Sequence, residues 1–312
     1  MRNGKFLIAA GVAVTVLLAT VPATTQQPKK LKMMYTLVGG FGSSYLAQES
    51  GLFAKHGLDV EFIATNASGN NPPALVSGSV EVAGPTMPTV LQANDAGLDI
   101  VVIAGGSVYP LPGDVLVARP GSGIEKPADL KGKTVGVPGL GALLHFMLIR
   151  SLKNNGVDPA SVRFVELGFA QATDALKSGQ IDAYPSQAPF TARILQSGAG
   201  YEVANWLKDT PDGTLTVVHA ATRKWATDNR ATVKAWRDAM RESNALALKD
   251  VNALNNAIAK YTKLPPAVVA SLPPPNLVVD ITPVQTKFWI DLAKEQGAIK
   301  GNPDPASVIF TP

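Results

Sequence analysis

The chain lacks cysteine entirely and has only three histidines among its 312 residues. Without cysteine it can form no disulfide, no thiolate nucleophile and no iron–sulfur cluster. The three histidines, His56, His145 and His219, do not form an HExxH motif, so the sequence predicts no zinc-enzyme site. We expect neither a resident metal nor a resident cofactor.

Charged residues are also sparse, at 17%, and the formal net charge is only +4. This balance gives no reason to expect a nucleic-acid partner. The basic cluster at 29–32 is interpreted as a solvated approach to the first strand. An apolar content of 46% is typical of a globular chain, and this length predicts about two domains.

The amino terminus has the pattern of a secretory signal. Arg2 and Lys5 precede an uncharged run over 6–20, and Val21-Pro22-Ala23 provides small residues for cleavage near Ala23. A helix over 6–20 would span about 22 Å, less than the roughly 30 Å hydrocarbon core, so a membrane anchor fits less well. No twin arginine or lipoprotein cysteine is present. We therefore predict a signal peptide over 1–23, Sec export, and a free mature chain in the periplasm.

Two segments 101 residues apart resemble each other: ALVSGSVE at 74–81 and ALKSGQID at 175–182. Upstream of them, predicted strands at 31–38 and 134–137 run into glycine-rich turns, each opening a helical pattern. Each half therefore has the predicted element order strand, turn, helix, strand, helix, strand. This order is typical of an α/β unit with parallel strands.

This repeat predicts an α/β fold of two Rossmann-like lobes joined by two crossover segments. Apolar runs at 115–118 and 215–218 bracket the second half, so we expect the chain to cross between lobes there. The predicted boundaries are 29–116 plus 217–312 for one lobe and 117–216 for the other.

The last hundred residues are predicted to return to the first lobe as helices. One has Val233, Trp236 and Met240 on one face, and a later one has Val284, Phe288 and Leu292 on one face. Gly297 follows that second pattern at a position suited to ending the helix. We interpret these aromatic stripes as core.

Ligands of open parallel sheets bind beyond the carboxyl ends of the strands. Two facing lobes would form a cleft there, lined by loops at 39–44, 85–88, 139–142 and 184–189. The candidate ligand-binding residues are Phe41, Gly42, Ser43, Ser44, Thr86, Met87, Gly139, Leu140, Gly141, Ala142, Tyr184, Gln187 and Pro189.

Several of these residues have a second interpretation. Ser43 and Ser44 could cap a helix or donate to a ligand, with capping favoured. His145 could be packed or could face the pocket, and the sequence does not separate the two. Gly139-Leu140-Gly141 resembles part of a dinucleotide fingerprint, but Leu144 stands where the third glycine belongs. A tight turn at a helix start explains both glycines.

Motifs for hydrolysis and phosphate binding are absent. Gly132-Lys133-Thr134 resembles the end of a phosphate loop, but Pro127 replaces its first glycine. No Gly-x-Ser-x-Gly elbow occurs. Glu81 and Asp182 occupy matching repeat positions, so we predict a structural role for both, such as fixing a loop.

Four stretches carry a family resemblance: 47–60 (AQESGLFAKHGLDV), 74–81, 129–137 (DLKGKTVGV) and 179–183 (GQIDA). In this order and spacing the chain resembles periplasmic solute-binding proteins of ABC importers, of the nitrate, sulfonate and taurine (NMT1-like) class. The resemblance covers essentially the whole mature chain. It implies a type II periplasmic-binding fold that closes on a small solute and delivers it to a permease in the inner membrane.

The resemblance implies a monomer that performs no chemistry and ligand contacts from loops like the four named above. Members that hold an oxyanion often place hydroxyl residues at the second-lobe helix start, where this chain has Gly139 to Ala142. We therefore expect a small organic solute, anionic, with an apolar or aromatic body. The alternatives are a secreted small-molecule enzyme on this scaffold, a binder of a thiamine-pyrimidine precursor, and a sensor subunit that loads a membrane receptor.

Overall fold

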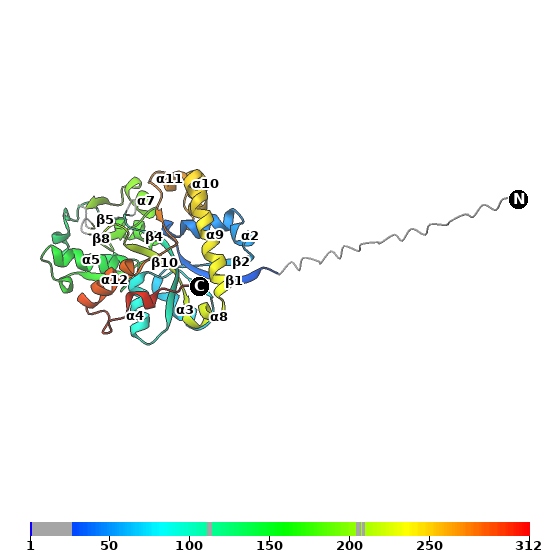
Figure 1. The fold of residues 1–312 in the computed structure, drawn as a ribbon. Coiled ribbons are helices and arrows are strands. Elements are labelled where there is room, and N and C mark those ends of the chain that lie inside the picture. The colour runs from blue at the N-terminus through cyan, green and yellow to red at the C-terminus, as the bar shows by residue number, and fades with distance from the viewer. Residues whose placement is uncertain (2–26, 111–113, 204–206, 208–209) are drawn as a thin grey trace.

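Two β-sheets organise the chain, each forming one of two lobes in the computed structural model (Figure 1). The structure describes residues 1, 27–110, 114–203, 207 and 210–312. The predicted signal peptide over 1–23 falls almost wholly outside these residues. Within them, no helix has the length and apolar character needed to cross a bilayer.

The sheet of lobe 1 has six strands in the order β11-β4-β10-β3-β1-β2. Its strands are β1 (Lys29–Thr36), β2 (Leu58–Thr65), β3 (Val82–Ala83), β4 (Ile100–Val108), β10 (Leu215–Thr222) and β11 (Asn276–Leu277). The sheet of lobe 2 has the order β7-β6-β8-β5-β9. Its strands are β5 (Val115–Ala118), β6 (Thr134–Val137), β7 (Arg163–Glu166), β8 (Ala183–Ser186) and β9 (Tyr201–Val203). Both sheets are mixed, because antiparallel strands extend a parallel core.

The parallel cores of the two sheets repeat the same order, β3-β1-β2 and β8-β6-β7. The two halves of the sequence repeat therefore lie in separate sheets, as predicted. The chain passes from lobe 1 to lobe 2 between β4 and β5, and returns between β9 and β10. The predicted lobe boundaries at 116/117 and 216/217 fall inside β5 and β10, so that Val115 and Leu116 lie in the sheet of lobe 2 and Leu215 and Thr216 in the sheet of lobe 1.

The carboxylates at matching repeat positions make the same contact in each lobe. Glu81 Oε2 accepts a hydrogen bond from the backbone N–H of Lys32 in β1 at 2.7 Å. Asp182 Oδ2 accepts one from Thr134 N–H in β6 at 2.9 Å. Each carboxylate ties the turn before the third strand to the first strand, which confirms the predicted structural role.

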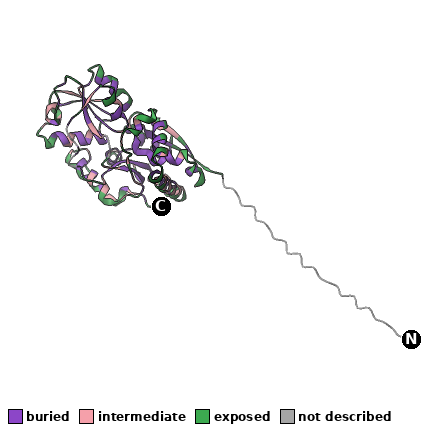
Figure 2. Cartoon of the chain, turned by 90° about the horizontal axis from the view of Figure 1, so that it is seen from above, coloured by how far each residue is buried: buried purple, intermediate pink, exposed green. Residues whose placement is uncertain are grey.

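Helices cover the faces of both sheets, so that the buried residues lie along the strands and the inward helix faces (Figure 2). Lobe 1 carries α1 (Gly42–Glu49), α2 (Leu52–Lys55), α3 (Asn71–Val76), α4 (Met87–Asp95), α8 (Arg223–Asp228), α9 (Arg230–Lys249), α10 (Val251–Thr262), α11 (Pro266–Ala270) and α12 (Pro283–Glu295), with short 3-10 turns at Gly39–Phe41, Ser68–Asn70 and Pro305–Val308. Lobe 2 carries α5 (Leu143–Asn154), α6 (Phe169–Lys177) and α7 (Phe190–Gln196), with 3-10 turns at Pro127–Leu130 and Pro159–Ser161.

The carboxy-terminal helices partly match their predicted faces. On α9, Val233, Trp236 and Met240 are buried as expected. On α12 the predicted face is wrong at Val284, whose exposed fraction is 78%. Of the other two predicted residues, Leu292 is buried as expected and Phe288 is half-buried. The buried face also includes Thr286, Trp289, Ile290 and Ala293, because Trp289 Nε1 donates to Leu215 O at 2.9 Å and fixes the helix rotation. Gly297, with φ of +67°, follows the end of α12 as predicted.

Candidate functional site

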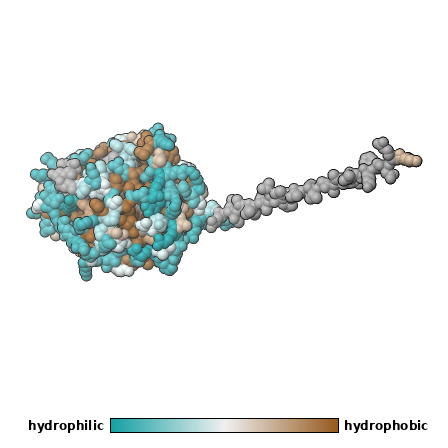
Figure 3. Space-filling view, viewed as in Figure 1, coloured by the Kyte–Doolittle hydropathy of each residue, from teal (hydrophilic) through white to brown (hydrophobic). Residues whose placement is uncertain are grey.

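The two lobes touch through loops at the carboxyl ends of their strands. The backbone N–H of Gly39, after β1, donates to Ala188 O, after β8, at 3.4 Å. Gln92 Nε2 on α4 donates to Gly141 O, before α5, at 2.7 Å. Three of the four predicted loop regions therefore make contacts between the lobes, and the fourth, 85–88, leads into the helix that carries Gln92. Figure 3 shows apolar residues gathered toward the middle of one face, between hydrophilic flanks.

Three neighbouring cavities lie between the lobes. The crossover cavity (about 30 Å³) is lined by Val38, Gly39, Gly40, Asp114, Gln187, Ala188, Pro189, Val217, Asn255, Ile258, Val269 and 273–275. The central cavity (about 30 Å³) is lined by Thr36, Val38, Ser68, Gly84, Thr86, Pro138, Ala142, Leu143, Leu144, Phe169, Gln187 and Val217. The edge cavity (about 110 Å³) is lined by Thr36, Leu37, Thr65, Asn66, Gly168, Phe169, Ala170 and Gln171.

These cavities share walls and follow the strand ends. Val38, Gln187 and Val217 separate the crossover and central cavities, and Thr36 and Phe169 separate the central and edge cavities. Residues directly after β1, β2, β3, β6, β7 and β8 all contribute. Drug-sized ligands occupy roughly 300 Å³ or more, so the lobes are nearly closed and must part to admit an organic solute.

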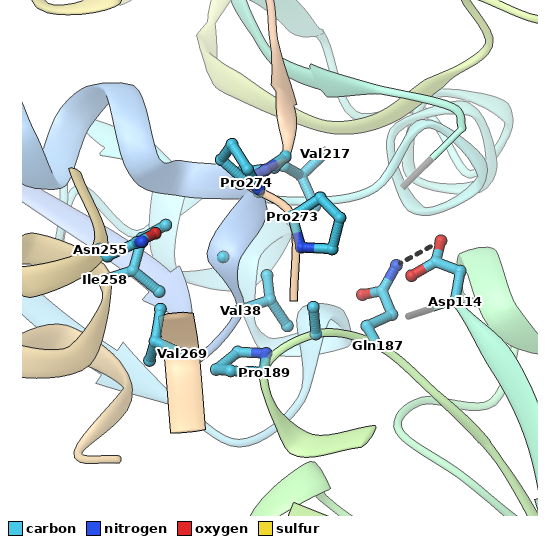
Figure 4. A pocket seen from close by; sticks show the side chains of 14 residues that line it. Val38, Asp114, Gln187, Pro189, Val217, Asn255, Ile258, Val269, Pro273 and Pro274 are labelled. Atoms are coloured by element: carbon cyan, nitrogen blue, oxygen red, sulfur yellow. Dashed lines mark hydrogen bonds between the residues drawn. The ribbon is translucent and has the colours of Figure 1, made fainter. Parts of the chain in front are cut away.

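Four predicted residues line the cavities. Thr86, Ala142 and Gln187 line the central cavity, Gln187 also faces the crossover cavity, and Pro189 lines the latter. Figure 4 shows Gln187, Asp114, Val38 and Pro189 around the crossover cavity, with the amide of Gln187 turned to Asp114. Sequence reasoning missed Thr36, Val38, Ser68, Asp114, Phe169 and Val217. The strand-end argument could have indicated Thr36 and Val38, since both lie at the end of the predicted strand over 31–38.

The predicted aromatic and methionine contacts are core residues that line none of the three cavities. Phe41, Met87 and Tyr184 are fully buried. The Phe41 ring packs where a side chain on Gly84 would stand, and the Tyr184 ring packs against Gly136. Tyr184 Oη donates to Leu167 O at 2.8 Å. The rings of Phe41 and Tyr184 thus occupy the space beside Gly84 and Gly136 that a larger residue would fill with its own side chain.

The predicted binding residues at the start of α1 make their contacts within lobe 1. Gly42 packs against Leu254 of α10, and Ser43 Oγ donates to Asn244 Oδ1 at 2.5 Å. The predicted capping role is wrong, because Phe41 is the N-cap residue and no side chain caps α1. Instead Ser44 Oγ lies 2.9 Å from Phe41 O and 3.2 Å from His219 Nε2.

The buried ring of His219 is held in one tautomer. Its Nδ1 lies 3.1 Å from Gly105 O, and a carbonyl only accepts, so Nδ1 carries the proton. Nε2 is then an acceptor, and it shares the single hydroxyl proton of Ser44 with Phe41 O. Burial lowers the pKa of His219 to about 4. The hydroxyl of Ser44 is thus engaged within the lobe.

The turn before α5 is likewise fixed by its own lobe. Leu140 N–H donates to Glu166 Oε2 and Gly141 N–H donates to His145 Nδ1, both at 3.0 Å. Burial lowers the pKa of His145, whose ring packs edge-on against Phe164. His145 therefore has the packed role of the two considered. Gly139 and Leu140 do not line the three cavities, and the Leu140 side chain is 52% exposed.

Asp114 contributes the one charged side chain among the residues that line the three cavities. Its Oδ2 lies 3.4 Å from Gln187 Nε2. Burial raises the pKa of Asp114 well above the usual value, with the Gln187 hydrogen bond opposing that rise in part. Among the described residues, no group of three or more histidine, cysteine, aspartate or glutamate side chains could hold a metal ion.

Comparisons with known proteins agree with this architecture. A putative aliphatic sulfonates-binding protein of Escherichia coli K12 is 31% identical over 202 residues, covering 64% of this chain and 60% of that protein. The formylaminopyrimidine-binding protein of Halalkalibacterium halodurans is 30% identical over 139 residues, covering 45% and 41%. The matches thus span about half the length of these relatives.

Among solved structures, the alkanesulfonate-binding protein SsuA of Xanthomonas axonopodis pv. citri bound to MOPS superposes with a TM-score of 0.77. It is 24% identical, and the match covers 91% of this chain and 99% of that one. The likeness shows the periplasmic binding protein fold. A family model described as NMT1/THI5 like matches residues 40–252. With the duplicated lobes and the cavities between them, this match shows that the chain belongs to the NMT1/THI5-like family.

Proposed function

We propose that the protein is the solute-binding component of an ABC importer and binds a small organic solute between its lobes without transforming it. The observation that carries the proposal is the row of three cavities where the strand ends of two duplicated lobes face each other. Ligands of α/β sheets bind at such strand ends. Family membership and the solute-binding roles named for its relatives support the same role.

Several contacts between the two lobes can form only when the lobes lie close together, as they do in the closed form. Gln92 reaches Gly141, and Gln296 Nε2, just past α12, donates to Phe146 O on α5 at 2.8 Å. Arg150 of α5 also lies over the Phe288 ring of α12, 5.3 Å from its centroid. A solute that contacts both lobes binds the closed form better than the open form, and this difference shifts the population toward closure.

The lining chemistry favours binding over catalysis. Hydroxyls of Thr36, Ser68 and Thr86 and the amide of Gln187 can orient a solute, while Leu143, Leu144 and Phe169 cover an apolar body. Asp114, the charged lining residue, has no histidine, lysine or serine partner among the described residues to complete a nucleophile or an acid–base pair. The periplasm and an inner-membrane permease complete the proposal, in accord with the export signal predicted from the sequence.

Binding of a pyrimidine is the second candidate. The formylaminopyrimidine-binding relative supports it, and a flat heterocycle would suit the apolar and amide lining around Gln187.

The proposal is tested by mass spectrometry of small molecules released when freshly purified protein is denatured, followed by thermal-shift assays with the compounds found. A ligand at 100 times its Kd should add about 2.7 kcal/mol to stability. If a solute is converted beyond one equivalent per protein, the protein is an enzyme and the proposal fails. It also fails if no molecule is released and no organic solute shifts the melting temperature.

A further inference from the structure

Among the residues that the structure describes, no positive side chain lines the three cavities between the lobes. Their lining residues include no lysine, arginine or histidine, and they include one carboxylate, Asp114. Sulfonate and nitrate are full anions, which proteins usually hold with arginine, lysine or several aimed N–H donors. The charge of this site therefore opposes the anionic solute that the sequence led us to expect.

The amino terminus of α5 does not reverse this balance. A helix start favours a negative group only modestly. The N–H groups of Leu140 and Gly141, on the turn leading into α5, already donate to Glu166 and His145. An anionic solute would also share the cleft with the carboxyl group of Asp114, which is unfavourable for a second negative group.

Asp114 has an unsatisfied oxygen. Its Oδ1 is out of contact with solvent and receives no hydrogen bond, while Oδ2 meets Gln187 Nε2 at 3.4 Å. In the part of the chain that the structure describes, no lysine or arginine forms an ion pair with it. A buried acceptor without a donor is costly, and burial raises the pKa of Asp114 accordingly.

The crossover cavity that Asp114 lines is otherwise mostly apolar, with Asn255 and Gln187 as its other polar side chains. Val38, Ile258, Val269 and Pro273 of lobe 1 and Pro189 of lobe 2 line the same cavity, and Gln187 lies beside Asp114 (Figure 4). A solute with an apolar body in the crossover cavity would thus bring its polar end within reach of this carboxyl group. Gln187 lines both the crossover and the central cavity and keeps that group oriented.

Building on the proposed solute-binding function, we propose that the solute carries an N–H donor, an ammonium group or the amino group of a nitrogen heterocycle, that binds Asp114 Oδ1. An ammonium would form an ion pair with the carboxylate. An amino-substituted ring would donate its N–H to Oδ1 and accept at its ring nitrogen a hydrogen bond from the protonated Oδ2, so that neither partner carries a charge.

The experiment measures affinities by titration calorimetry on protein freed of copurified ligand. Benzylamine, benzyl alcohol and phenylmethanesulfonate share one skeleton and differ in charge, and 4-aminopyrimidine and pyrimidine differ by the amino group. Benzylamine or 4-aminopyrimidine should bind at least about tenfold more tightly than its amine-free partners. Which of the two binds distinguishes an ammonium from an aminoheterocycle.

The variant Asp114→Leu keeps a similar size and removes both carboxyl oxygens, so it should lower the affinity for the preferred amine at least about tenfold. Asp59→Leu, on the exposed face of β2, is the matched control and should leave the affinity unchanged. If Asp114→Leu does not fold, the ranking of probes by the unaltered protein decides the question alone.

The outcomes separate this inference from the proposed function. Tighter binding of the sulfonate or the alcohol than of the amine overturns the solute class but leaves solute binding intact. Full amine affinity in Asp114→Leu also overturns it. If no probe binds, the molecule released on denaturation decides: one with an N–H donor supports the inference, and one without it, or no molecule at all, rejects it.

Discussion

Gln92 and Gly141 lie in different lobes and are joined by a hydrogen bond of 2.7 Å from the side-chain amide to the backbone carbonyl. Gly141 has φ of +73°, and a Cβ there would lie 2.9 Å from Gln92 Oε1. The glycine thus serves two purposes at once, since it permits the left-handed turn before α5 and leaves room for the contact. This relationship links the sequence of a tight turn to closure of the lobes.

Gln92→Ala should weaken closure, because the bond to Gly141 exists only when the lobes approach. Losing one hydrogen bond of about 0.5–1.5 kcal/mol should raise the Kd of the bound solute roughly two- to tenfold. Small-angle scattering should show a larger radius of gyration for the ligand-free variant. Gln48→Ala on α1, which lies within lobe 1, is the control. Identical Kd and radius for Gln92→Ala and the unaltered protein would show that this contact has no part in closure.

Asp182→Ala should destabilise lobe 2 more than Glu81→Ala destabilises lobe 1, although the two carboxylates hold equivalent turns. Asp182 is only 19% exposed and also pairs with Arg119 at 2.9 Å. Its removal therefore leaves the backbone N–H of Thr134 and the Arg119 guanidinium without their partner, which should cost about 1–3 kcal/mol of unfolding free energy. The hydrogen bond of Glu81 to Lys32 N–H is exposed, so water can replace it, and the expected cost is within about 0.5 kcal/mol. Urea unfolding of both variants gives the comparison. Equal or reversed costs would contradict the argument from burial.

His219 should make stability fall as the pH is lowered. Its folded-state pKa of about 4 lies below the ordinary value of 6.5, so the unfolded chain takes up the proton first. The neutral ring's contribution is fully present above pH 6.5 and is lost progressively down to pH 4, amounting to about 2 kcal/mol by pH 5.

The measurement for His219 is the free energy of unfolding of the unaltered protein and of His219→Gln at pH 7.5 and pH 5. Because the variant lacks this titration, its stability deficit should shrink by about 2 kcal/mol at the lower pH. Other groups titrate equally in both proteins and cancel in the difference. A deficit that stays constant between the two pH values would mean that the ring is not held neutral in the fold.

Much of the fold could be predicted from the sequence because its determinants are local and repeated. The strand predicted over 134–137 has its observed bounds, and the one predicted over 31–38 is β1 at Lys29–Thr36, since short apolar runs between turn residues leave few alternatives. The 101-residue repeat then indicated two similar sheets. The rotation of α12 could not be predicted this way, because the bond from Trp289 to Leu215 O is tertiary.

The site was predicted only at the level of loops. Strand ends indicate where a ligand binds, but not which side chains of a loop face the cleft. Phe41 and Tyr184 turn into the core because Gly84 and Gly136 leave room for their rings, and such pairings are not visible along the chain. Asp114 was missed because it lies before β5, where the repeat gave no signal.

Tyr184 and Gln187 lie on the same predicted loop, but the structure separates their roles and so predicts opposite mutational effects. Tyr184→Phe removes only the hydrogen bond to Leu167 O, which should cost about 1 kcal/mol of stability and leave the solute Kd unchanged. Gln187→Ala removes a side chain that lines two cavities and orients Asp114. The solute Kd of this variant should rise about tenfold or more with little loss of stability.

Calorimetric titration and thermal unfolding of both variants separate binding from folding. An unchanged Kd for Gln187→Ala would move the solute away from the wall between the crossover and central cavities. A raised Kd for Tyr184→Phe would place it against the core ring instead.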